Sequence, residues 1–243
     1  MEAAIYERMA AVEDRHWWFA ARRAIVDRMI DGLKLTSDAE ILEGGCGTGG
    51  NFPMLRRHGR IFAVEPNATA REFASRAGLA TIEDGRLPDQ IPFGDRKFDL
   101  AIMTDVLEHL SDDVGSLKAL RARLNSTGWL ILTVPAYQWM WSGHDVSHHH
   151  LRRYTAKSLK RVVDASGFDC RYASYCNLLL FPAIAAVRLA HRALGSTGKE
   201  DHDLSMPSPI VNRLLYEIYA SERYMIGRFR APFGVSLIAL AHA

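Results

Sequence analysis

The stretch "ILEGGCGTGGN", residues 41–51, decides the fold. An apolar run ends there in a cluster of glycines, and a helical pattern follows. Because glycine has no side chain, the backbone at Gly45 and Gly47 can lie against a ligand, and the N–H groups at the start of the next helix point outward. Gly45, Gly47 and Gly50 have the spacing of a dinucleotide-binding loop, and Glu65 lies twenty residues after Gly45. The pattern predicts a ligand that contains adenosine, with its ribose hydroxyls on the Glu65 carboxylate.

Strand-like and helix-like patterns alternate from about residue 39 onward. Such alternation predicts a mostly parallel sheet covered by helices on both faces. The expected strands are residues 39–44, 60–65, 79–83, 98–103, 128–134, 168–175 and 235–242. The expected helices are residues 51–58, 68–77, 113–124 and 156–166, with N-caps at Asp112 and Thr155 and helix ends at Gly78 and Gly167.

Composition is that of an ordinary soluble α/β domain, with 48% hydrophobic and 24% charged residues among 243. The formal charge of +2, without a broad basic face or a recognition domain, gives no reason to expect nucleic acid. Three cysteines without CxxC spacing predict neither a disulfide framework nor a zinc ribbon, and they fit a reducing cytosol. The first residues lack the pattern of a signal peptide.

Four segments resemble, in order, the motifs of class I S-adenosylmethionine (SAM)-dependent methyltransferases over roughly residues 38–170: "ILEGGCGTG", "FAVEPN", "FDLAIMTDVLEHL" and "LNSTGWLILTVPAY". The resemblance implies an α/β fold with a Rossmann-like, doubly wound, seven-stranded sheet, mostly parallel with the last strand antiparallel. It also implies a single methyltransferase domain over residues 1–243. The expected parts are an N-terminal helical lid (1–35), a SAM-binding core (36–176), a helical insertion (177–230) and a final strand (231–243).

The flanking segments "EDRHWWFAARRAIV", "VPAYQWMWSGHD", "HLRRYT" and "PFGVSLIALA" resemble a poorly characterised bacterial subgroup with HWWF and HxRRY motifs. That subgroup has a loose association with cell-envelope or glycan pathways. His149 stands where its members usually have glycine. The aromatic residues of the HWWF segment could staple the N-terminal helix to the core. Alternatively, Trp18 could cover the cofactor, since an aromatic face stabilises a desolvated cation by up to about 2 kcal/mol, while His16 faces the acceptor.

The resemblance also implies a set of cofactor contacts. The Glu43 carboxylate and the loop at Gly45, Cys46, Gly47 and Gly49 would hold the methionine end. The remaining contacts are expected from Glu65 and Pro66 at the ribose, Asp84 and Gly85 at the adenine, and Thr104 and Asp105 beside the sulfonium. Glu108 and His109 are expected to form a helix-start pair at the surface rather than to act in catalysis.

The segment "WSGHDVSHHHLRRYT", residues 141–155, follows the expected fifth strand and therefore lies at the carboxyl edge of the sheet, where ligands bind. Histidine titrates near neutral pH, so we expect His150 or His144, with Asp145, to act as a general base or to orient the acceptor. A metal is not expected here, because Asp145 is the only acid of the segment and adjacent histidines could not easily share one zinc ion.

Acceptor recognition is expected from the same region. Arg152 and Arg153 could hold a carboxylate or phosphate by paired hydrogen bonds, or could pair with acids of the chain. The other expected acceptor-binding residues are His16, Tyr137, Trp141 and Tyr154. Residues 151–199 contain nine Arg or Lys against two acids, which makes them a candidate surface for an anionic substrate or a lipid headgroup.

The sequence thus predicts an enzyme that transfers a methyl group from SAM, leaving S-adenosyl-L-homocysteine, to a small-molecule or lipid- or glycan-linked acceptor, which could be anionic. Oxygen is the expected target atom. The alternatives are a catalytically silent SAM-binding protein and an NAD-dependent oxidoreductase. The apolar segment 177–190 is too short to cross a bilayer, so it would cap the acceptor pocket, pack in the core or lie against a membrane. We expect a cytoplasmic protein, with contact to the inner face of the membrane as an option.

Overall fold

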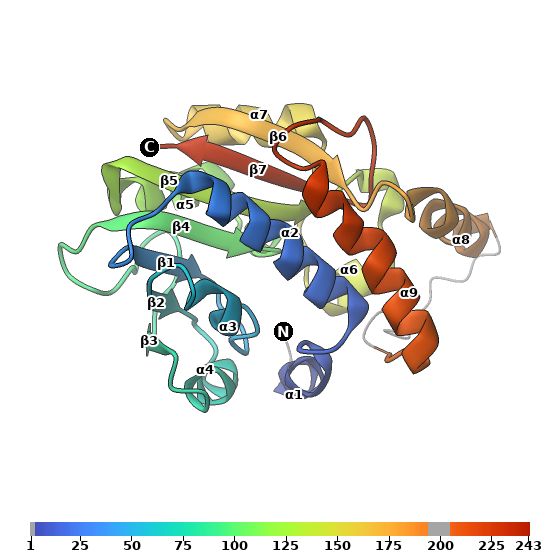
Figure 1. Ribbon diagram of the computed structural model, residues 1–243, viewed down its shortest axis with the longest axis horizontal. Helices are drawn as coiled ribbons and strands as arrows, with labels where there is room; N and C mark the ends of the chain where they lie inside the picture. Colours follow the sequence, from blue (N-terminus) through green and yellow to red (C-terminus); the bar gives the residue numbers. More distant parts are fainter. Residues whose placement is uncertain (1–2, 194–204) are drawn as a thin grey trace.

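The computed structural model describes residues 3–193 and 205–243. The seven expected strands form within these residues and lie in one sheet of order β3-β2-β1-β4-β5-β7-β6 (Figure 1). They are β1 (Glu40–Gly44), β2 (Arg60–Val64), β3 (Ala80–Glu83), β4 (Phe98–Thr104), β5 (Leu124–Pro135), β6 (Asp169–Cys176) and β7 (Ser236–His242). Strands β1 to β5 pair in parallel, whereas β7 is antiparallel to β5 and β6. The predicted Rossmann-like fold, with an antiparallel last strand, is confirmed.

Side chains of the central strands alternate between two hydrophobic cores, one on each face of the sheet. Ile41 of β1 packs into one core, and its neighbour Leu42 packs into the other. Ile131 and Leu132 of β5 divide in the same way. Parallel strands that are covered on both faces have nearly continuous apolar runs, which makes these strands recognisable in the sequence.

Helices cover both faces of the sheet, and α2 and α9 run side by side across one of them (Figure 1). The α-helices are α1 (Ala3–Val12), α2 (Trp17–Leu33), α3 (Phe52–Leu55), α4 (Ala68–Ser75), α5 (Asp113–Ala122), α6 (Gly143–Ser147), α7 (Ala156–Ala165), α8 (Phe181–Ala193) and α9 (Pro209–Ala220). Short 3-10 helices are η1 (Leu107–His109), η2 (Gln138–Met140) and η4 (Ser221–Tyr224). Helices α2, α3 and α9 complete the core around Ile41, and α5 and α7 complete the core around Leu42.

The N-caps predicted from the sequence are confirmed at α5 and α7. The Asp112 carboxylate accepts the Gly115 N–H at 2.8 Å, and the Thr155 hydroxyl accepts the Ser158 N–H at 3.1 Å. Each cap satisfies a backbone donor that the helix itself leaves without a partner. After α7, Gly167 takes a φ of +84°, the left-handed conformation that ends helices at low cost in glycine.

One predicted helix is shorter than expected. The pattern of residues 51–58 predicted two turns, but α3 ends at Leu55. The N–H groups of Arg57 and His58 bond to carbonyls three residues earlier, which tightens the chain into turns before it enters β2. The N-terminal helical segment consists of two helices, because the chain turns between Val12 and Trp17.

The predicted helical insertion contains α8 and α9, and most of the polar loop between them lies outside the described residues. Within residues 3–193 and 205–243, no helix combines the length and apolar character needed to span a bilayer. The insertion is fastened at its base by buried Glu222. Its carboxylate accepts N–H groups of Asn177 and Leu178 at 2.8 and 2.7 Å, and that of Leu179 at 3.4 Å.

Replacing Glu222 by alanine should therefore lower the free energy of unfolding by about 2–5 kcal/mol, because buried N–H groups would lose their acceptor. Urea unfolding of the wild type and of Glu222→Ala measures this difference. Glu217→Ala, which removes an exposed carboxylate from α9, is the matched control and should cost less than about 0.5 kcal/mol. Equal stabilities of the two variants would contradict the fastening role.

Candidate active site

The carboxyl ends of β1, β2 and β4 meet at one edge of the sheet and open into a cavity of about 440 Å³, here called the glycine-loop cavity. Gly45 follows β1, Glu65 follows β2 and Asp105 follows β4, and all three line the cavity. In open α/β sheets ligands bind at this edge. The adenosine-type ligand predicted from the sequence therefore has a cavity at the expected place.

The glycine loop is held in a conformation that side chains would disturb. Gly45 has a φ of +73°, and a Cβ on it would lie 2.8 Å from both methyl groups of Val106. Gly47 also has a positive φ, of +54°, and a Cβ there would have only Met9, at 3.9 Å, near it. Gly47 lines the cavity, so a side chain at this position would extend into open space. The loop thus presents bare backbone to the cavity.

Glu65 links the glycine loop to the end of β2. One of its carboxylate oxygens accepts the Gly47 N–H at 3.0 Å, and the other accepts the Asn67 N–H at 2.9 Å. The side chain is buried, and burial raises the pKa of Glu65 although both N–H groups oppose the shift. Each oxygen keeps a further lone pair, so the carboxylate can still accept hydroxyl groups from the cavity.

Most of the predicted cofactor residues line this cavity: Gly45, Cys46, Gly47, Glu65, Pro66, Gly85, Thr104 and Asp105. Four others lie elsewhere: Glu43, Gly49, Asp84 and Trp18.

Two of these four residues have partners away from the cavity. The Asp84 side chain is 71% exposed and pairs with Arg71 at 2.9 Å. Trp18 does not cover the glycine loop as the lid hypothesis expected, because its ring packs 5.6 Å from the ring of Tyr219 on α9. The structure thus places Trp18 where it packs α2 against α9, in agreement with the alternative interpretation that the aromatic residues of the HWWF segment fasten the N-terminal helix to the core.

Glu43 lies one layer behind the cavity. Its carboxylate accepts a bond from the Asn51 side chain at 2.7 Å, and the same amide donates to the Thr104 hydroxyl at 2.9 Å. Asn51 and Thr104 both line the cavity, so Glu43 positions lining residues and does not itself face a ligand. Complete burial raises the pKa of Glu43 to about 8.

Helix α1 and the turn that follows it supply lining residues that the sequence did not reveal. Tyr6, Met9 and Glu13 line the glycine-loop cavity, and the Thr48 hydroxyl donates to the Glu13 carboxylate at 2.6 Å. α1 thereby closes over the loop, a position that the lid hypothesis gave to the tryptophans. Glu13 is the first acid after α1, but no spacing rule connects it with Thr48, so only the fold reveals the contact.

A second cavity, of about 510 Å³ and here called the histidine cavity, adjoins the first. Its walls come from α2, α8, the strand ends and the histidine segment. Its lining combines polar, aromatic and aliphatic side chains, which include His16, Trp17, Trp18, Glu108, His109, His144, His148, His150, Arg153, Ile184, Val187 and Arg188. Both cavities share Met9, Phe19, Arg22, Thr104, Asp105, His109 and His148, so they meet at the end of β4.

The predicted histidine–aspartate pair forms. His150 Nδ1 lies 2.9 Å from the Asp145 carboxylate, which also accepts two bonds from the Arg153 guanidinium at 2.7 and 2.9 Å. Burial alone would raise the pKa of Asp145, but the bonds from His150 and Arg153 outweigh it and hold that pKa below its usual value. His144 stacks on His148 with ring centroids 3.9 Å apart.

The two arginines of the HxRRY motif pair with acids of the chain. Arg153 is only 4% exposed and is bound by Asp145, and Arg152 pairs with Asp113 at 3.0 Å. Tyr154 is buried and donates to Asp113 at 3.0 Å. This arrangement is the alternative to the anion site that the sequence suggested, because both guanidinium groups already hold carboxylates.

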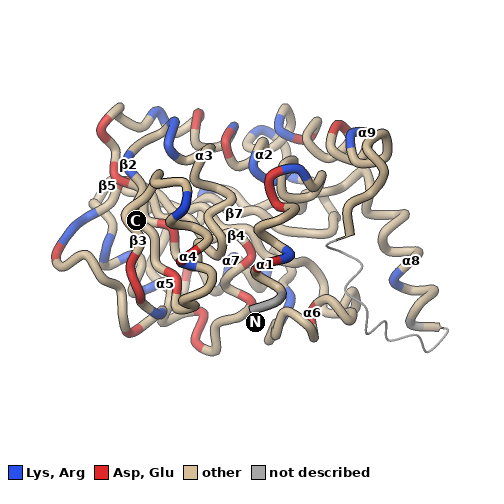
Figure 2. Tube along the Cα trace, turned by 90° about the horizontal axis from the view of Figure 1, so that it is seen from below, with Lys and Arg blue, Asp and Glu red and all other residues tan. Residues whose placement is uncertain are grey.

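Other basic residues of this half of the chain also have acidic neighbours. Lys160 pairs with Asp164, and Arg171 with Asp169. Figure 2 shows Lys and Arg interspersed with Asp and Glu along the trace rather than gathered in one place. Arg152, Arg153, Lys160 and Arg171 are thus paired with acids of the chain.

Tyr137 and Trp141 line neither cavity. The ring of Tyr137 stacks on the ring of Tyr175 with centroids 4.9 Å apart. The ring of Trp139 stacks on the ring of Tyr137 with centroids 5.7 Å apart. These rings support the segment that leads from β5 to α6.

Glu108 and His109 are not the surface pair that the sequence predicted. Glu108 has no exposed surface, because η1 lies under the segment that carries His150, and the N–H of Leu151 bonds to the Glu108 carbonyl at 2.8 Å. Burial, followed by the nearby Asp105 carboxylate, raises the pKa of Glu108 well above its usual value. Burial and the neighbouring His150 and His148 lower the pKa of His109 to about 3.

The family model for a methyltransferase domain matches residues 15–173, which is more than half of the chain. The chain belongs to this methyltransferase-domain family. A probable SAM-dependent methyltransferase of Mycolicibacterium smegmatis is 22% identical over 160 residues, which cover 64% of this chain and 61% of the relative. The chain therefore matches about three fifths of the length of that relative.

Solved methyltransferase structures share the fold. A chain of the complex between the Haloferax volcanii Trm112 methyltransferase activator and "the putative methyltransferase" superposes with a TM-score of 0.61 at 18% identity, covering 99% of this chain and 93% of that one. A SAM-dependent methyltransferase of Mesorhizobium loti gives a TM-score of 0.57 at 14% identity, covering 88% and 96%.

SAM is the cofactor that the motif resemblance implies, and the residues at the glycine-loop cavity fit it. The loop gives a backbone surface that a Cβ on Gly47 would obstruct, and the buried Glu65 carboxylate offers lone pairs to ribose hydroxyls. A 2′-phosphate would be repelled by the same carboxylate, which disfavours the phosphorylated nicotinamide cofactor.

The Glu65→Ala variant should bind S-adenosylhomocysteine at least about tenfold more weakly, because the ribose hydroxyls would lose a charged acceptor. Isothermal titration calorimetry measures the affinity. Asp84→Ala is the matched control and should bind within about twofold of the wild type, since that side chain is exposed and outside the cavity. An unchanged affinity of Glu65→Ala would exclude the ribose contact.

Glu43 should make the protein less stable as the pH rises. A carboxyl group with a folded pKa near 8 and an ordinary unfolded pKa of 4.5 binds more protons in the folded state between these values, so stability falls with pH in that window. Arg22 lowers and Glu13 and Glu65 raise the pKa of Glu43, but burial is the largest cause. Urea unfolding at about pH 6 and 9 should show a smaller loss in Glu43→Gln than in the wild type. An equal loss in both proteins would refute the assignment.

Proposed function

We propose that the protein transfers a methyl group from SAM to a hydroxyl oxygen of a small-molecule or lipid- or glycan-linked acceptor that binds in the histidine cavity. The observation that carries the proposal is the junction of the two cavities at Thr104, Asp105 and His109. A group that leaves the glycine-loop cavity at this point enters the histidine cavity directly.

The lining of the histidine cavity supports an acceptor with an apolar body and a polar end. Trp17, Trp18 and Ile184 offer apolar surface, whereas His144 and His150 are imidazoles at the end of the cavity near β4. Aromatic and aliphatic walls with a few convergent polar groups are typical of sites for small organic ligands.

Exposed apolar residues on the insertion support a lipid-linked acceptor. Val187 and Leu189 on α8 are 55% and 52% exposed, and Ile210 and Leu214 on α9 are 83% and 58% exposed. Val187 also lines the histidine cavity. An acceptor with a long apolar chain could therefore enter beside α8 while the protein contacts the membrane surface that holds it.

SAM supplies the methyl group as a sulfonium, so the acceptor oxygen gains a carbon and loses a proton while sulfur keeps the electron pair of the broken bond. The chain must position that oxygen and accept or release its proton. His150 is oriented by Asp145, and Asp145 is fixed by Arg153. This arrangement can orient an imidazole toward an acceptor, and His144 is its neighbour, with ring centroids 5.5 Å apart.

The test is to incubate the protein with methyl-labelled SAM and separate extracts of bacterial lipids, glycans and soluble metabolites. We expect label in an acceptor from one of these fractions, stable as a methyl ether or ester by mass spectrometry. Label on nitrogen or carbon would refute oxygen as the target. Label in no fraction, with S-adenosylhomocysteine still bound, would favour the alternative of a catalytically silent SAM-binding protein.

Filling the histidine cavity should separate acceptor binding from cofactor binding. In Ile184→Trp the larger ring would occupy the acceptor space and lower label transfer about tenfold or more, with unchanged affinity for S-adenosylhomocysteine. Leu189→Trp on the same helix is the matched control, because Leu189 is 52% exposed and lies outside the cavity. Normal transfer by Ile184→Trp would exclude this cavity as the acceptor site.

A further inference from the structure

We propose that Glu108, His109 and His150 bind one divalent transition-metal cation, with Zn²⁺ the best match, and that this cation holds the acceptor's hydroxyl oxygen. The cation-binding part stands on its own geometry. The role toward the acceptor rests on the proposed function.

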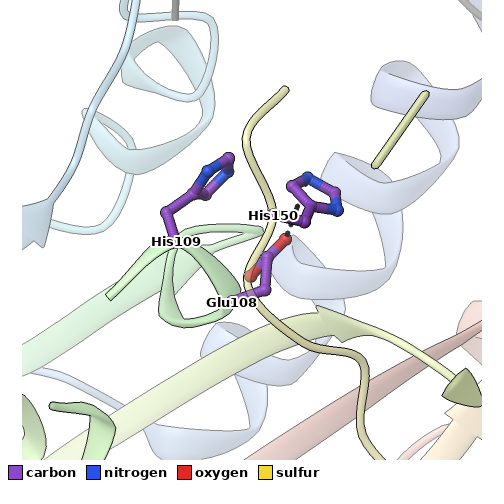
Figure 3. A group of neighbouring side chains, drawn as sticks. All are labelled: Glu108, His109 and His150. Carbon is purple, nitrogen blue, oxygen red and sulfur yellow. Dashed lines mark ion pairs between the residues drawn. The ribbon is translucent and has the colours of Figure 1, made fainter. Parts of the chain in front are cut away.

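The three side chains converge from two separate segments. Glu108 and His109 belong to η1 after β4, and His150 follows α6, about forty residues later in the chain. One ligand atom from each residue lies within 4.8 Å of the others, and His150 Nε2 is 3.9 Å from a Glu108 oxygen (Figure 3). The ligand atoms of a tetrahedral zinc with bonds of about 2.0–2.1 Å lie roughly 3.4 Å apart, so small side-chain rotations would complete the site.

Glu108 gives an independent reason to expect a cation. Its side chain has no exposed surface, and neither carboxylate oxygen has a hydrogen-bond partner. A buried carboxylate without partners is costly, so such a group either takes up a proton or, when it stays charged, pairs with a cation or coordinates a metal. The imidazole of His150 alone does not provide it, because its Nε2 is 3.9 Å away, beyond hydrogen-bond distance.

The surroundings of His150 match those of a metal-binding histidine. Its Nδ1 lies 2.9 Å from the Asp145 carboxylate, and Asp145 is held by Arg153 and by the Ser142 N–H at 2.8 Å. A carboxylate behind a ligating histidine fixes the tautomer and aims the other nitrogen at the metal. Nε2 is the atom that faces Glu108.

The ligand set and its location fit a catalytic ion. Two histidines and one glutamate are a known zinc ligand set, which leaves a coordination position for water or substrate. All three residues line the histidine cavity, and His109 also lines the glycine-loop cavity. The open position therefore faces the space proposed for the acceptor, at the junction through which a methyl group would pass.

Such a cation would activate the acceptor without redox chemistry. When a hydroxyl oxygen binds the divalent ion, its O–H pKa falls, as it does for zinc-bound water, and the proton is released to a water molecule or to His144. The metal–oxygen bond forms, the O–H bond breaks, and the charge of the ion does not change. His150 Nε2 is then a ligand, so the cation would take over the base role that the sequence suggested for His150.

A second cluster of potential ligands does not have these properties. Asp27, Asp31 and His58 also come close together, but Asp27 already pairs with Arg57 at 2.6 Å and with His58 at 2.7 Å. Asp31 is exposed. The Asp27 carboxylate is compensated by the chain and Asp31 is open to solvent, so this group serves as an internal comparison.

The test is metal binding by the full chain after treatment with a chelator and its removal. Calorimetry with Zn²⁺ should give one ion per chain, and Co²⁺ should produce the visible absorption of a site with nitrogen and oxygen ligands. His109→Ala and His150→Ala should each weaken Zn²⁺ binding by about 100-fold or more, since loss of a residue behind a ligand already costs 10–100-fold. His191→Ala, which removes an exposed histidine of α8, is the matched control and should bind like the wild type.

Circular dichroism of each variant shows that it is folded, and the Co²⁺ spectrum of the wild type does not depend on any variant. Absence of a stoichiometric site in the wild type, or equal Zn²⁺ affinity in His109→Ala, would overturn the cation site. Full label transfer by chelated protein would overturn the role of the cation while the proposed function stands. Stoichiometric Zn²⁺ binding without any label transfer would support the site and count against the proposed function.

Discussion

The ion pair between Arg22 of α2 and Asp105 at the end of β4 holds the two halves of the site together. Asp105 has a φ of +54° and accepts the Thr133 hydroxyl at 3.0 Å, so its carboxylate is fixed from the strand side as well. Both partners line both cavities. The pair therefore attaches α2 to the carboxyl edge of the sheet at the place where the two cavities meet.

The two cavities depend on different kinds of structure. The glycine-loop cavity is built from backbone at the strand ends and from the buried Glu65 carboxylate, with buried Glu43 behind it. The histidine cavity takes its walls from α2, α8 and the segment after β5, which are additions around the sheet. Because one fold supports many reactions, the acceptor must be sought from these additions and not from the sheet.

Several charged side chains of the site pair with charged side chains of the same chain. Asp145 holds Arg153 and His150, and Asp113 holds Arg152. Arg153 thus supports His150 through Asp145, and both arginines of the HxRRY motif already bind carboxylates of the chain instead of an anionic ligand. Glu108 is the contrasting case, a buried carboxylate whose oxygens lack hydrogen-bond partners, and this contrast is what singles out its neighbourhood as a metal site.

The sequence by itself determined the order of strands and helices, the glycine loop and the acid Glu65, because apolar periodicity, glycine spacing and helix caps act over a few residues. It could not show that α1 closes the loop through Glu13, that Trp18 packs on Tyr219, or that Glu108 is buried against His150. These contacts join segments far apart in the chain, and no local pattern encodes them. Only the folded sheet, which brings those segments to one edge, decides which side chains meet.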